Sequence, residues 1–408
     1  MRILVVGAGG VGSAIAAIAQ HRSFYDHMTV ADIDPARAAR AVDRLAEPDR
    51  FSSSRVDASD QAAVRDLVRA TRADVVVNAT DPRFNLPIFR AAFDARCMYL
   101  DMAMSLSEPH PDRPYSEPGV KLGDAQLAED DRWRDAGLLA LLGMGVEPGL
   151  SDVFARYATD ELFSSIDEIG IRDGANLVVE GHAFAPTFSI WTTIEECLNP
   201  PLVWERDHGW YTTAPFSEPE IFEFPEGIGP IECVNVEHEE VVLIPREIDC
   251  GRVTFKYGLG REFIDVLQTL HRLGLDSKER VRVGGAEVAP RDVVAAVLPD
   301  PATLGDRMAG KTCAGTFVSG TGRDGAPRSV FLYHVADNER TMAEYRTQAV
   351  VWQTAINPVL ALELLADGSW ERVGVRGPEA FDASVFLERM RRAGWDYGMV
   401  ERSAAVVV

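Results

Sequence analysis

Residues 1–34 read MRILVVGAGGVGSAIAAIAQHRSFYDHMTVADID, and this stretch decides the fold expected for the chain. Residues 2–6 are apolar and β-branched, which is typical of a buried parallel strand. A G-x-G-x-x-G pattern follows, and an alanine- and isoleucine-rich run then predicts a helix. A second strand at residues 27–31 ends at Asp32, about 20 residues beyond the last glycine. This order of elements predicts a dinucleotide-binding βαβ unit.

Each part of the predicted unit has a task in holding a dinucleotide. Gly7 permits a tight turn, Gly9 lets the backbone approach a pyrophosphate, and Gly12 lets the helix pack on the strand. The free N–H groups at the helix start bind the phosphates. The Asp32 carboxylate can accept hydrogen bonds from the ribose hydroxyls. The residues assigned to the cofactor in this unit are Gly7, Gly9, Gly10, Val11, Gly12 and Asp32.

The acid at the end of the second strand also bears on which cofactor binds. Asp32 would repel a 2′-phosphate, which favours NAD over NADP. Arg37 and Arg40 lie just beyond and could hold that phosphate, so NADP stays possible.

Two later strand ends complete the expected cofactor site, because ligands bind at the carboxyl edge of a parallel sheet. A weak third strand spans residues 51–56, and the turn after it should lie beside the adenine. A fourth strand at residues 74–78 should end near the nicotinamide. The residues expected at these two strand ends are Asp57, Ala58, Asn78, Ala79 and Thr80.

The whole pattern predicts an α/β protein, with an N-terminal Rossmann domain followed by an α+β substrate and dimerisation domain. Strands and helices alternate up to the turn GMGVEPGLSD at residues 143–152, and strands with alternating polarity dominate beyond it. The helical residues 341–365 and a last helix at 383–392 should pack back on the first domain. The predicted divisions are 1–145, 146–340 and 341–408.

The second domain holds one misleading motif. Residues 305–312, GDRMAGKT, satisfy the P-loop pattern, but a proline-rich turn precedes them and a β-like run follows. We interpret the segment as a structural loop that places Lys311 near the active site. The strands predicted in this domain are 168–172, 177–182, 232–236, 241–244, 252–257, 316–319 and 329–335, with helices at 263–273 and 291–298.

Composition limits the class of partner. The net charge of −22 opposes binding to nucleic acid and to anionic membranes. Five scattered cysteines form no C-x-x-C pair and no metal-ligand spacing, so we expect no metal site and a reducing cytoplasm. The pattern predicts that no apolar run reaches the length of a transmembrane helix. We therefore expect a small-molecule partner, with no nucleic acid and no membrane.

The sequence resembles the saccharopine dehydrogenase-like family, which includes saccharopine reductase, L-lysine 6-dehydrogenase and carboxynorspermidine dehydrogenase. The segments that carry the resemblance are GAGGVG (7–12), NATDPRFNLPIFRAAFDARCMYLDMA (78–103), GMGVEPGLSD (143–152), EFPEGIGPIECVNVEHEEVVLIPR (223–246) and GVRGPEAFDASVFLERM (374–390). The resemblance implies a homodimeric NAD(P)-dependent oxidoreductase that acts on the C–N bond of an amino acid or secondary amine.

Amine oxidation by hydride transfer needs a base for the amine proton and groups that hold the substrate. Asp101 follows a predicted strand and can hold an ammonium, while Glu147 in the Gly/Pro turn can act as a base. The resemblance adds His238, on a strand that faces substrate in the lysine dehydrogenase branch, and His182 ends another strand. The substrate-binding candidates are the pocket-wall residues Trp191, Thr192 and Thr193, and the carboxylate-binding residues Arg246, Lys256, Arg261 and Lys311.

The resemblance implies that the chain is a lysine 6-dehydrogenase or a saccharopine-type enzyme. The chain lacks the longer segment that saccharopine reductase has between the equivalents of His182 and Trp191, which weakens the saccharopine assignment. A carboxynorspermidine- or opine-type imine reductase is the alternative, and a non-catalytic nucleotide-binding regulator is another. If the chain is an enzyme and not a non-catalytic regulator, we expect Asp101, Glu147 and His238 to converge beside the nicotinamide.

Overall fold

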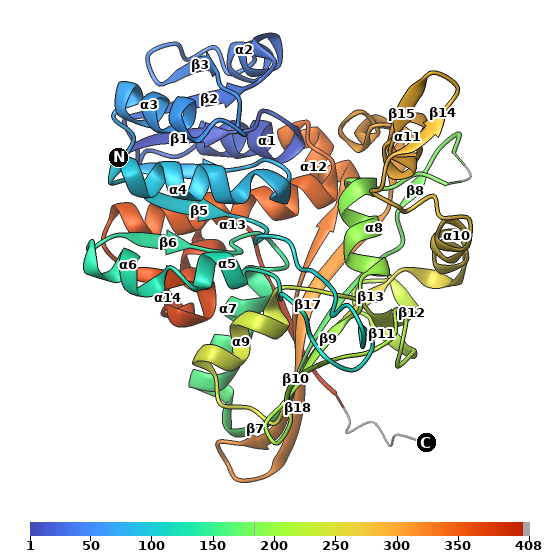
Figure 1. Cartoon of the computed structure of the whole chain (residues 1–408). Helices are drawn as coiled ribbons and strands as arrows, with labels where there is room; N and C mark the ends of the chain where they lie inside the picture. Colours follow the sequence, from blue (N-terminus) through green and yellow to red (C-terminus); the bar gives the residue numbers. More distant parts are fainter. Residues whose placement is uncertain (183, 403–408) are drawn as a thin grey trace.

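The computed structural model describes residues 1–182 and 184–402, which form two sheets with helices around them (Figure 1). The first sheet has seven parallel strands in the order β19-β6-β5-β4-β1-β2-β3. Its strands are β1 (Arg2–Val6), β2 (His27–Asp32), β3 (Phe51–Arg55), β4 (Val75–Asn78), β5 (Met98–Asp101), β6 (Leu139–Leu141) and β19 (Gly374–Arg376). Because β2 lies on one side of β1 and β4 on the other, the strand order reverses at β1, and ligands bind at such a switch point.

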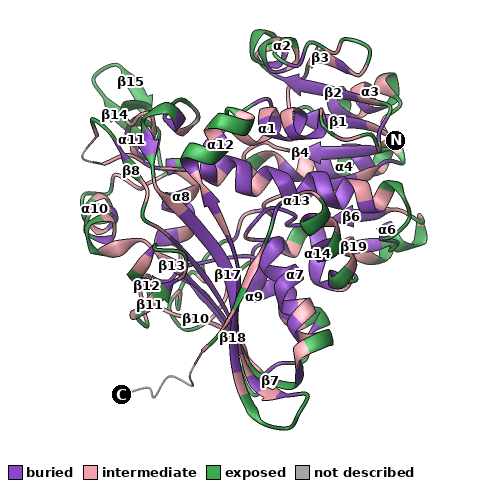
Figure 2. Ribbon diagram, turned by 180° about the vertical axis from the view of Figure 1, so that it is seen from behind, coloured by how far each residue is buried: buried purple, intermediate pink, exposed green. Residues whose placement is uncertain are grey.

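Helices cover both faces of this sheet, as buried parallel strands require. The helices α3 and α4 pack together on one face, and α1 packs against α13 on the other (Figures 1 and 2). The helices around the first sheet are α1 (Gly10–Ala19), α2 (Pro35–Asp43), α3 (Gln61–Thr71), α4 (Asn85–Ala95), α5 (Asp124–Leu127), α6 (Asp130–Asp135), α13 (Ala349–Ala366) and α14 (Ala383–Arg392), with the short η1 (Pro82–Phe84) before α4.

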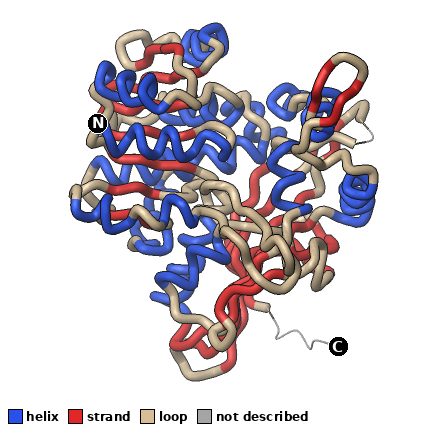
Figure 3. Tube along the Cα trace, viewed as in Figure 1, coloured by secondary structure: helices blue, strands red, loops and turns tan. Residues whose placement is uncertain are grey.

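The second sheet is mixed and has nine strands, and strands dominate this half of the molecule (Figure 3). A long β17–β18 hairpin forms its centre, with β7 beside β17 and the parallel partner β13 beside β7. Its strands are β7 (Phe163–Ala175), β9 (Leu202–Glu205), β10 (Gly209–Thr212), β11 (Glu220–Phe224), β12 (Gly229–Asn235), β13 (Arg252–Gly258), β17 (Lys311–Gly322), β18 (Pro327–Asp337) and β20 (Gly398–Glu401).

The remaining elements surround this second sheet. Two helices connect it to the first sheet, and a small helical and hairpin region lies beside α8. These elements are α7 (Leu150–Tyr157), η2 (Ala158–Leu162), β8 (Val178–Val179), α8 (Ile190–Leu198), α9 (Glu240–Glu247), α10 (Gly260–Arg272), β14 (Val281–Val283), β15 (Ala286–Val288), α11 (Pro290–Val297), η3 (Pro301–Thr303), η4 (Gly305–Arg307), β16 (Met308–Ala309), α12 (Asn338–Tyr345) and η5 (Pro378–Ala380).

The fold class expected from the sequence is confirmed, but several elements differ from their prediction. Residues 241–244, predicted as a strand, lie in helix α9, where all four are buried between α7 and β13. A short apolar run fits a buried helix as well as a strand, so its pattern could not decide. The predicted strand 177–182 shortens to Val178–Val179, and the helix predicted at 341–365 is two helices separated near Arg346, whose φ is 53°.

Helix α13 is long and apolar enough to meet the length and composition test for a membrane span, contrary to the expectation that no run would reach that length. Of its residues, 72% are buried inside the molecule, which is the usual state of a core helix (Figure 2). The P-loop-like segment passes through η4 and β16 into β17, so it lacks the strand–loop–helix order of a P-loop.

Candidate active site

The glycine turn between β1 and α1 has the shape of a dinucleotide cradle. Gly7 has a φ of +104°, and a Cβ there would lie 2.4 Å from the Ala79 carbonyl oxygen. A Cβ on Gly12 would lie 1.9 Å from the Gly7 carbonyl oxygen, so only glycine fits at either position. A Cβ on Gly9 would meet no atom within 4 Å, which leaves room for a pyrophosphate. No side chain caps the start of α1, so its N–H groups can bind phosphate, and the cradle fits the cofactor.

Asp32 lies at the end of β2, where an adenosine ribose would reach it. Its Oδ2 accepts a hydrogen bond of 2.9 Å from the Ala8 N–H, and its Oδ1 accepts one of 2.9 Å from the Asp34 N–H. The Arg37 guanidinium approaches the carboxylate to 4.0 Å. The side chain is therefore fixed in orientation and has a cation beside it that could serve a 2′-phosphate.

Replacing Asp32 by serine should shift the cofactor preference toward NADPH. The variant removes the charge that repels a 2′-phosphate and frees Arg37, so the ratio of kcat/KM for NADPH to that for NADH should rise about tenfold or more. Steady-state kinetics with both cofactors measures the ratio. Asp66→Ser, an exposed acid on α3, serves as the matched control, and an unchanged ratio in Asp32→Ser would refute the assigned role.

A cavity of about 320 Å³ lies between this cradle and the second sheet. Gly10, Val11, Asn78, Ala79 and Thr80 form its wall on the first sheet, as the sequence predicts for residues near the nicotinamide half. Asn78 is held in place because its Nδ2 donates to Asn85 at 2.7 Å and to the Tyr99 hydroxyl at 3.0 Å. The opposite wall includes the ionisable residues Glu147, Glu196, His238, Glu239 and Tyr257.

The charges around this cavity are strongly unbalanced. Among the described residues that line it, one side chain, His238, can carry a positive charge. The carboxyl side chains in the same lining are Asp81, Glu147, Glu196, Glu239 and Asp300. Asp81 is ion-paired with Arg83 at 2.9 Å, Asp300 is exposed, and Glu239 is paired with His238. The acids that can attract a cation into the cavity are therefore Glu147 and Glu196, because a buried carboxyl group needs a cationic or hydrogen-bonding partner.

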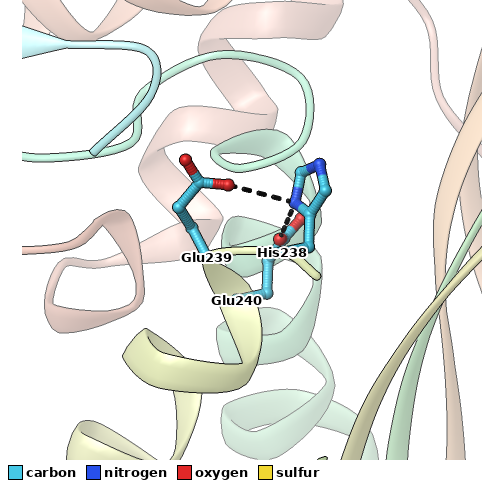
Figure 4. Close-up of side chains that lie close together, drawn as sticks. All are labelled: His238, Glu239 and Glu240. Atoms are coloured by element: carbon cyan, nitrogen blue, oxygen red, sulfur yellow. Dashed lines mark hydrogen bonds and ion pairs between the residues drawn. The ribbon is translucent and has the colours of Figure 1, made fainter. Parts of the chain in front are cut away.

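His238 is the centre of a buried charge cluster (Figure 4). Its Nδ1 lies 2.6 Å from Glu240 Oε2 and 3.3 Å from Glu239 Oε2, and its ring stacks on Phe255 at 3.7 Å. Burial alone would lower the pKa of His238, but the charges of Glu240 and Glu239 outweigh it and raise the pKa to about 10. The ring is therefore an imidazolium at neutral pH.

The other ring nitrogen of His238 points away from both glutamates in Figure 4. In the part of the chain that the structure describes, Nε2 has no hydrogen-bond partner, although the side chain is only 3% exposed. The three side chains also converge as metal ligands would, within 4.8 Å. The short Nδ1–Oε2 distance is that of a charge-assisted hydrogen bond, which leaves an Nε2–H donor facing the cavity.

Glu147 pairs with a second acid, Asp173 on β7. Burial, followed by the nearby Asp173 charge, raises the pKa of Glu147 well above its usual range. Burial also raises the pKa of Asp173 to about 6, although hydrogen bonds from Glu147 and Tyr257 oppose that rise. Glu147 Oε2 has no hydrogen-bond partner within the described residues. The two carboxyls therefore share a proton at neutral pH beside the cavity, as coupled acid pairs do.

Asp101 does not join Glu147 and His238 at the cavity. It is 1% exposed, and its carboxylate accepts hydrogen bonds from the Tyr99 hydroxyl (2.9 Å), Gln126 (2.8 Å) and the Gly143 N–H (2.7 Å). Burial raises the pKa of Asp101 to about 7. The Gly143 contact joins β5 to the loop after β6, while Tyr99 lies on β5 itself and Gln126 on α5. Asp101 therefore holds the turn that carries Glu147.

The predicted substrate-binding residues are dispersed. Thr192 lines the cavity, and Trp191 lines a smaller cavity beside it. Lys256 is ion-paired with Glu220 at 3.0 Å, and Lys311 donates to the Glu226 carbonyl at 3.3 Å. The predicted residues outside the described cavity linings are His182, Thr193, Arg246, Lys256, Arg261 and Lys311. Asp57 and Ala58 follow β3, outside the cavity.

The sequence analysis did not identify several of the ionisable residues in and around the cavity. Asp173, Glu196, Glu239, Glu240 and Tyr257 come from four different elements or their ends, and no spacing in the sequence links them. One signal was present, because the run EHEE at residues 237–240 places three acids around the predicted histidine.

Together the cradle, the parallel sheet and the ionisable cavity define a two-domain NAD(P)-dependent oxidoreductase. Residues 3–141 match the saccharopine dehydrogenase NADP binding domain, and residues 145–395 match the saccharopine dehydrogenase C-terminal domain. The chain belongs to the saccharopine dehydrogenase family, as its sequence motifs indicate.

Two curated relatives extend along almost the whole chain. Carboxynorspermidine synthase of Vibrio cholerae is 30% identical over 410 residues, covering 98% of this chain and 97% of that protein. Carboxyaminopropylagmatine dehydrogenase of Synechocystis is 28% identical over 396 residues, covering 96% of each. Apo saccharopine dehydrogenase (L-Glu forming) from Saccharomyces cerevisiae has a TM-score of 0.69 at 13% identity, covering 98% of this chain and 100% of that one, and therefore shares the fold.

Proposed function

We propose that this enzyme couples an amino-acid aldehyde to a di- or polyamine, reducing the imine between them to a carboxylated secondary amine. The observation that carries the proposal is the acidity of the cavity, where the carboxyl side chains of Glu147, Glu196 and Glu239 lie in a described lining whose single cation-forming side chain is His238. A polyamine brings several positive charges and fits such a site. An aldehyde with one α-carboxylate needs one cation, and His238 supplies it.

The relatives support an imine reductase of the carboxynorspermidine type over a lysine 6-dehydrogenase or a saccharopine-type enzyme. Both relatives are named for products or substrates that combine a carboxyl group with a cationic amine chain. Saccharopine carries three carboxylates, and this cavity offers one positively charged group to meet them. We therefore propose the carboxynorspermidine-type reaction as the activity of this enzyme. Oxidation of L-lysine is the alternative activity, and the experiment below distinguishes the two.

The proposed reaction combines an aldehyde, a primary amine, NAD(P)H and a proton, and yields a secondary amine, NAD(P)⁺ and water. The amine nitrogen bonds to the aldehyde carbon, and the resulting carbinolamine must lose its oxygen as water to form the imine. NAD(P)H supplies the hydride that the imine carbon accepts. The cavity wall at Asn78, Ala79 and Thr80 orients the reacting carbon.

The chain's own acids account for the proton steps. The Glu147–Asp173 pair holds a proton that it can give to the departing hydroxyl. The ionised pair can then regain a proton from the ammonium form of the next amine substrate, which must lose a proton before it attacks the aldehyde. The Nε2–H of His238 can bind the α-carboxylate of the aldehyde substrate, while Glu239 and Glu240 keep the ring positively charged.

The proposal is tested by following reduced-nicotinamide absorbance in both directions. We expect NADH or NADPH to be consumed when aspartate β-semialdehyde and 1,4-diaminobutane are supplied together, because that pair yields a carboxyaminopropyl amine. Each compound alone is the control. NADH formation from L-lysine with NAD, and no consumption in the coupling reaction, would overturn the proposal.

A further inference from the structure

A smaller cavity of about 20 Å³, here called the annex, adjoins the main cavity. The two share five lining residues from the loops after β4 and β5, from α8 and from the start of α9, namely Pro82, Ala103, Thr192, Glu196 and Glu239. Deeper in the annex the wall includes Met104, Leu106 and Leu122, and Glu237 lies among them. The annex thus has apolar walls and a carboxylate.

Glu237 is a buried acid without a cationic partner among the described residues. Its side chain is 7% exposed, and its Oε2 accepts hydrogen bonds from the Ser107 hydroxyl at 2.8 Å and from Asn199 Nδ2 at 2.9 Å. Both donors are neutral, and the described residues provide no donor to Oε1. Burial raises the pKa of Glu237 to about 7. The carboxylate is thus oriented by two side chains but its charge is not neutralised.

The other acids of the annex differ in whether they have a cationic partner. Glu195 is ion-paired with both Arg291 and Lys278, and Glu239 is paired with His238. Glu196 lines both cavities and has no side-chain hydrogen bond or ion pair to any described residue. Burial raises the pKa of Glu196 to about 8, so an incoming cation favours the ionised form of this group as it does that of Glu237. The two annex acids that have no cationic partner among the described residues are therefore Glu237 and Glu196.

We propose that the annex binds the distal cationic group of the amine substrate, with Glu237 and Glu196 as its counter-charges. This inference rests on the proposed function and names the end of the substrate that does not react. In this arrangement the reacting nitrogen lies in the main cavity, which Glu147 lines, the methylene chain passes the residues that the two cavities share, and a terminal ammonium, which is about the size of a water molecule, meets Glu237. The annex thereby selects α,ω-diamines over monoamines.

The test compares 1,4-diaminobutane with n-butylamine, which has the same chain length but no distal charge. With saturating aldehyde and cofactor, the wild-type enzyme should have a kcat/KM about 10- to 100-fold higher for the diamine. In Glu237→Gln that preference should fall by a similar factor, while kcat/KM for n-butylamine changes less than about threefold. Glu247→Gln, at an exposed acid ten residues further along the chain and outside the described cavity linings, is the matched control and should keep the preference.

Calorimetric binding of 1,4-diaminobutane to the cofactor-loaded protein separates this inference from the proposed function. Diamine binding that weakens in Glu237→Gln supports the annex even if no coupling occurs, and the absence of coupling then counts against the proposed function alone. Equal use of both amines by the wild type would overturn the inference. An equal loss of kcat/KM for the diamine and for n-butylamine in Glu237→Gln would also overturn it. The same holds if Glu237→Gln binds 1,4-diaminobutane with unchanged affinity. Glu196→Gln gives a second, independent variant if Glu237→Gln does not fold.

Discussion

Replacement of Glu147 by glutamine is expected to lower kcat about 10²- to 10³-fold, with little change in cofactor affinity. Glutamine keeps the size of the side chain but cannot give a proton to the departing hydroxyl. Burial and the Asp173 charge keep Glu147 protonated at neutral pH, so the wild-type kcat should fall on the alkaline side as this group ionises. The variant's residual kcat should lack that alkaline fall. Steady-state rates from about pH 6 to pH 10 measure both effects.

The matched control for Glu147 is an amide substitution that leaves the acid pair intact. Glu108→Gln meets this condition, because Glu108 is exposed and lies outside the main cavity lining. NADH binding by fluorescence and the melting temperature check that Glu147→Gln is folded. A variant that binds NADH normally and retains wild-type kcat would exclude Glu147 as the acid.

Replacement of His238 by glutamine is expected to destabilise the protein by about 3–5 kcal/mol, because it leaves Glu239 and Glu240 buried without their cation. The pKa of His238 rises from 6.5 to about 10 on folding. The imidazolium therefore contributes stability that is complete below pH 6.5 and is lost as the pH rises toward about 10. The loss in the variant should be large near pH 6 and smaller near about pH 9.

Urea unfolding at the two pH values measures this effect. The double variant His238→Gln/Glu240→Gln removes one of the unpaired charges and should recover part of the stability. In whichever variant folds, KM for the aldehyde should rise about tenfold or more, since the carboxylate loses its charged donor. A destabilisation that does not depend on pH would contradict the charged state assigned to His238.

The first domain was predictable because its signals are local. Strand β1, the glycine turn and Asp32 follow one another within the first 32 residues, and the structure places them around one cradle. The second domain was harder, since strands such as β7, β13 and β17 gain their partners from distant parts of the chain. Strand β19 could not be predicted as part of the first sheet, because nothing in the sequence near Gly374–Arg376 indicates pairing with β6.

The candidate site was predictable only in part, for the same reason. Glu147 and His238 stand in recognisable motifs, and both line the cavity. Asp101 also stands in a motif, but it accepts a hydrogen bond from the Gly143 N–H and so holds the loop after β6, and sequence cannot tell the direction of a side chain. Asp173 could not be found, because the β7 strand brings it to Glu147 only through the fold.

Some predictions of the sequence await direct tests. The divisions at residues 145 and 340, the homodimer and the cytoplasmic location remain predictions, as does the preference for NAD over NADP. Size-exclusion chromatography with light scattering would test the dimer.

The most direct measurement of the central claim is product analysis with a cofactor that carries deuterium at the transferable C4 position. Aspartate β-semialdehyde, 1,4-diaminobutane and the labelled NADH or NADPH would be incubated with the enzyme, and the products analysed by mass spectrometry. The account predicts a secondary amine whose mass equals the two substrates minus water, plus one hydrogen and one deuterium, with the deuterium on the new C–N carbon. Deuterium found in an alcohol formed from the aldehyde, or none transferred at all, would contradict it.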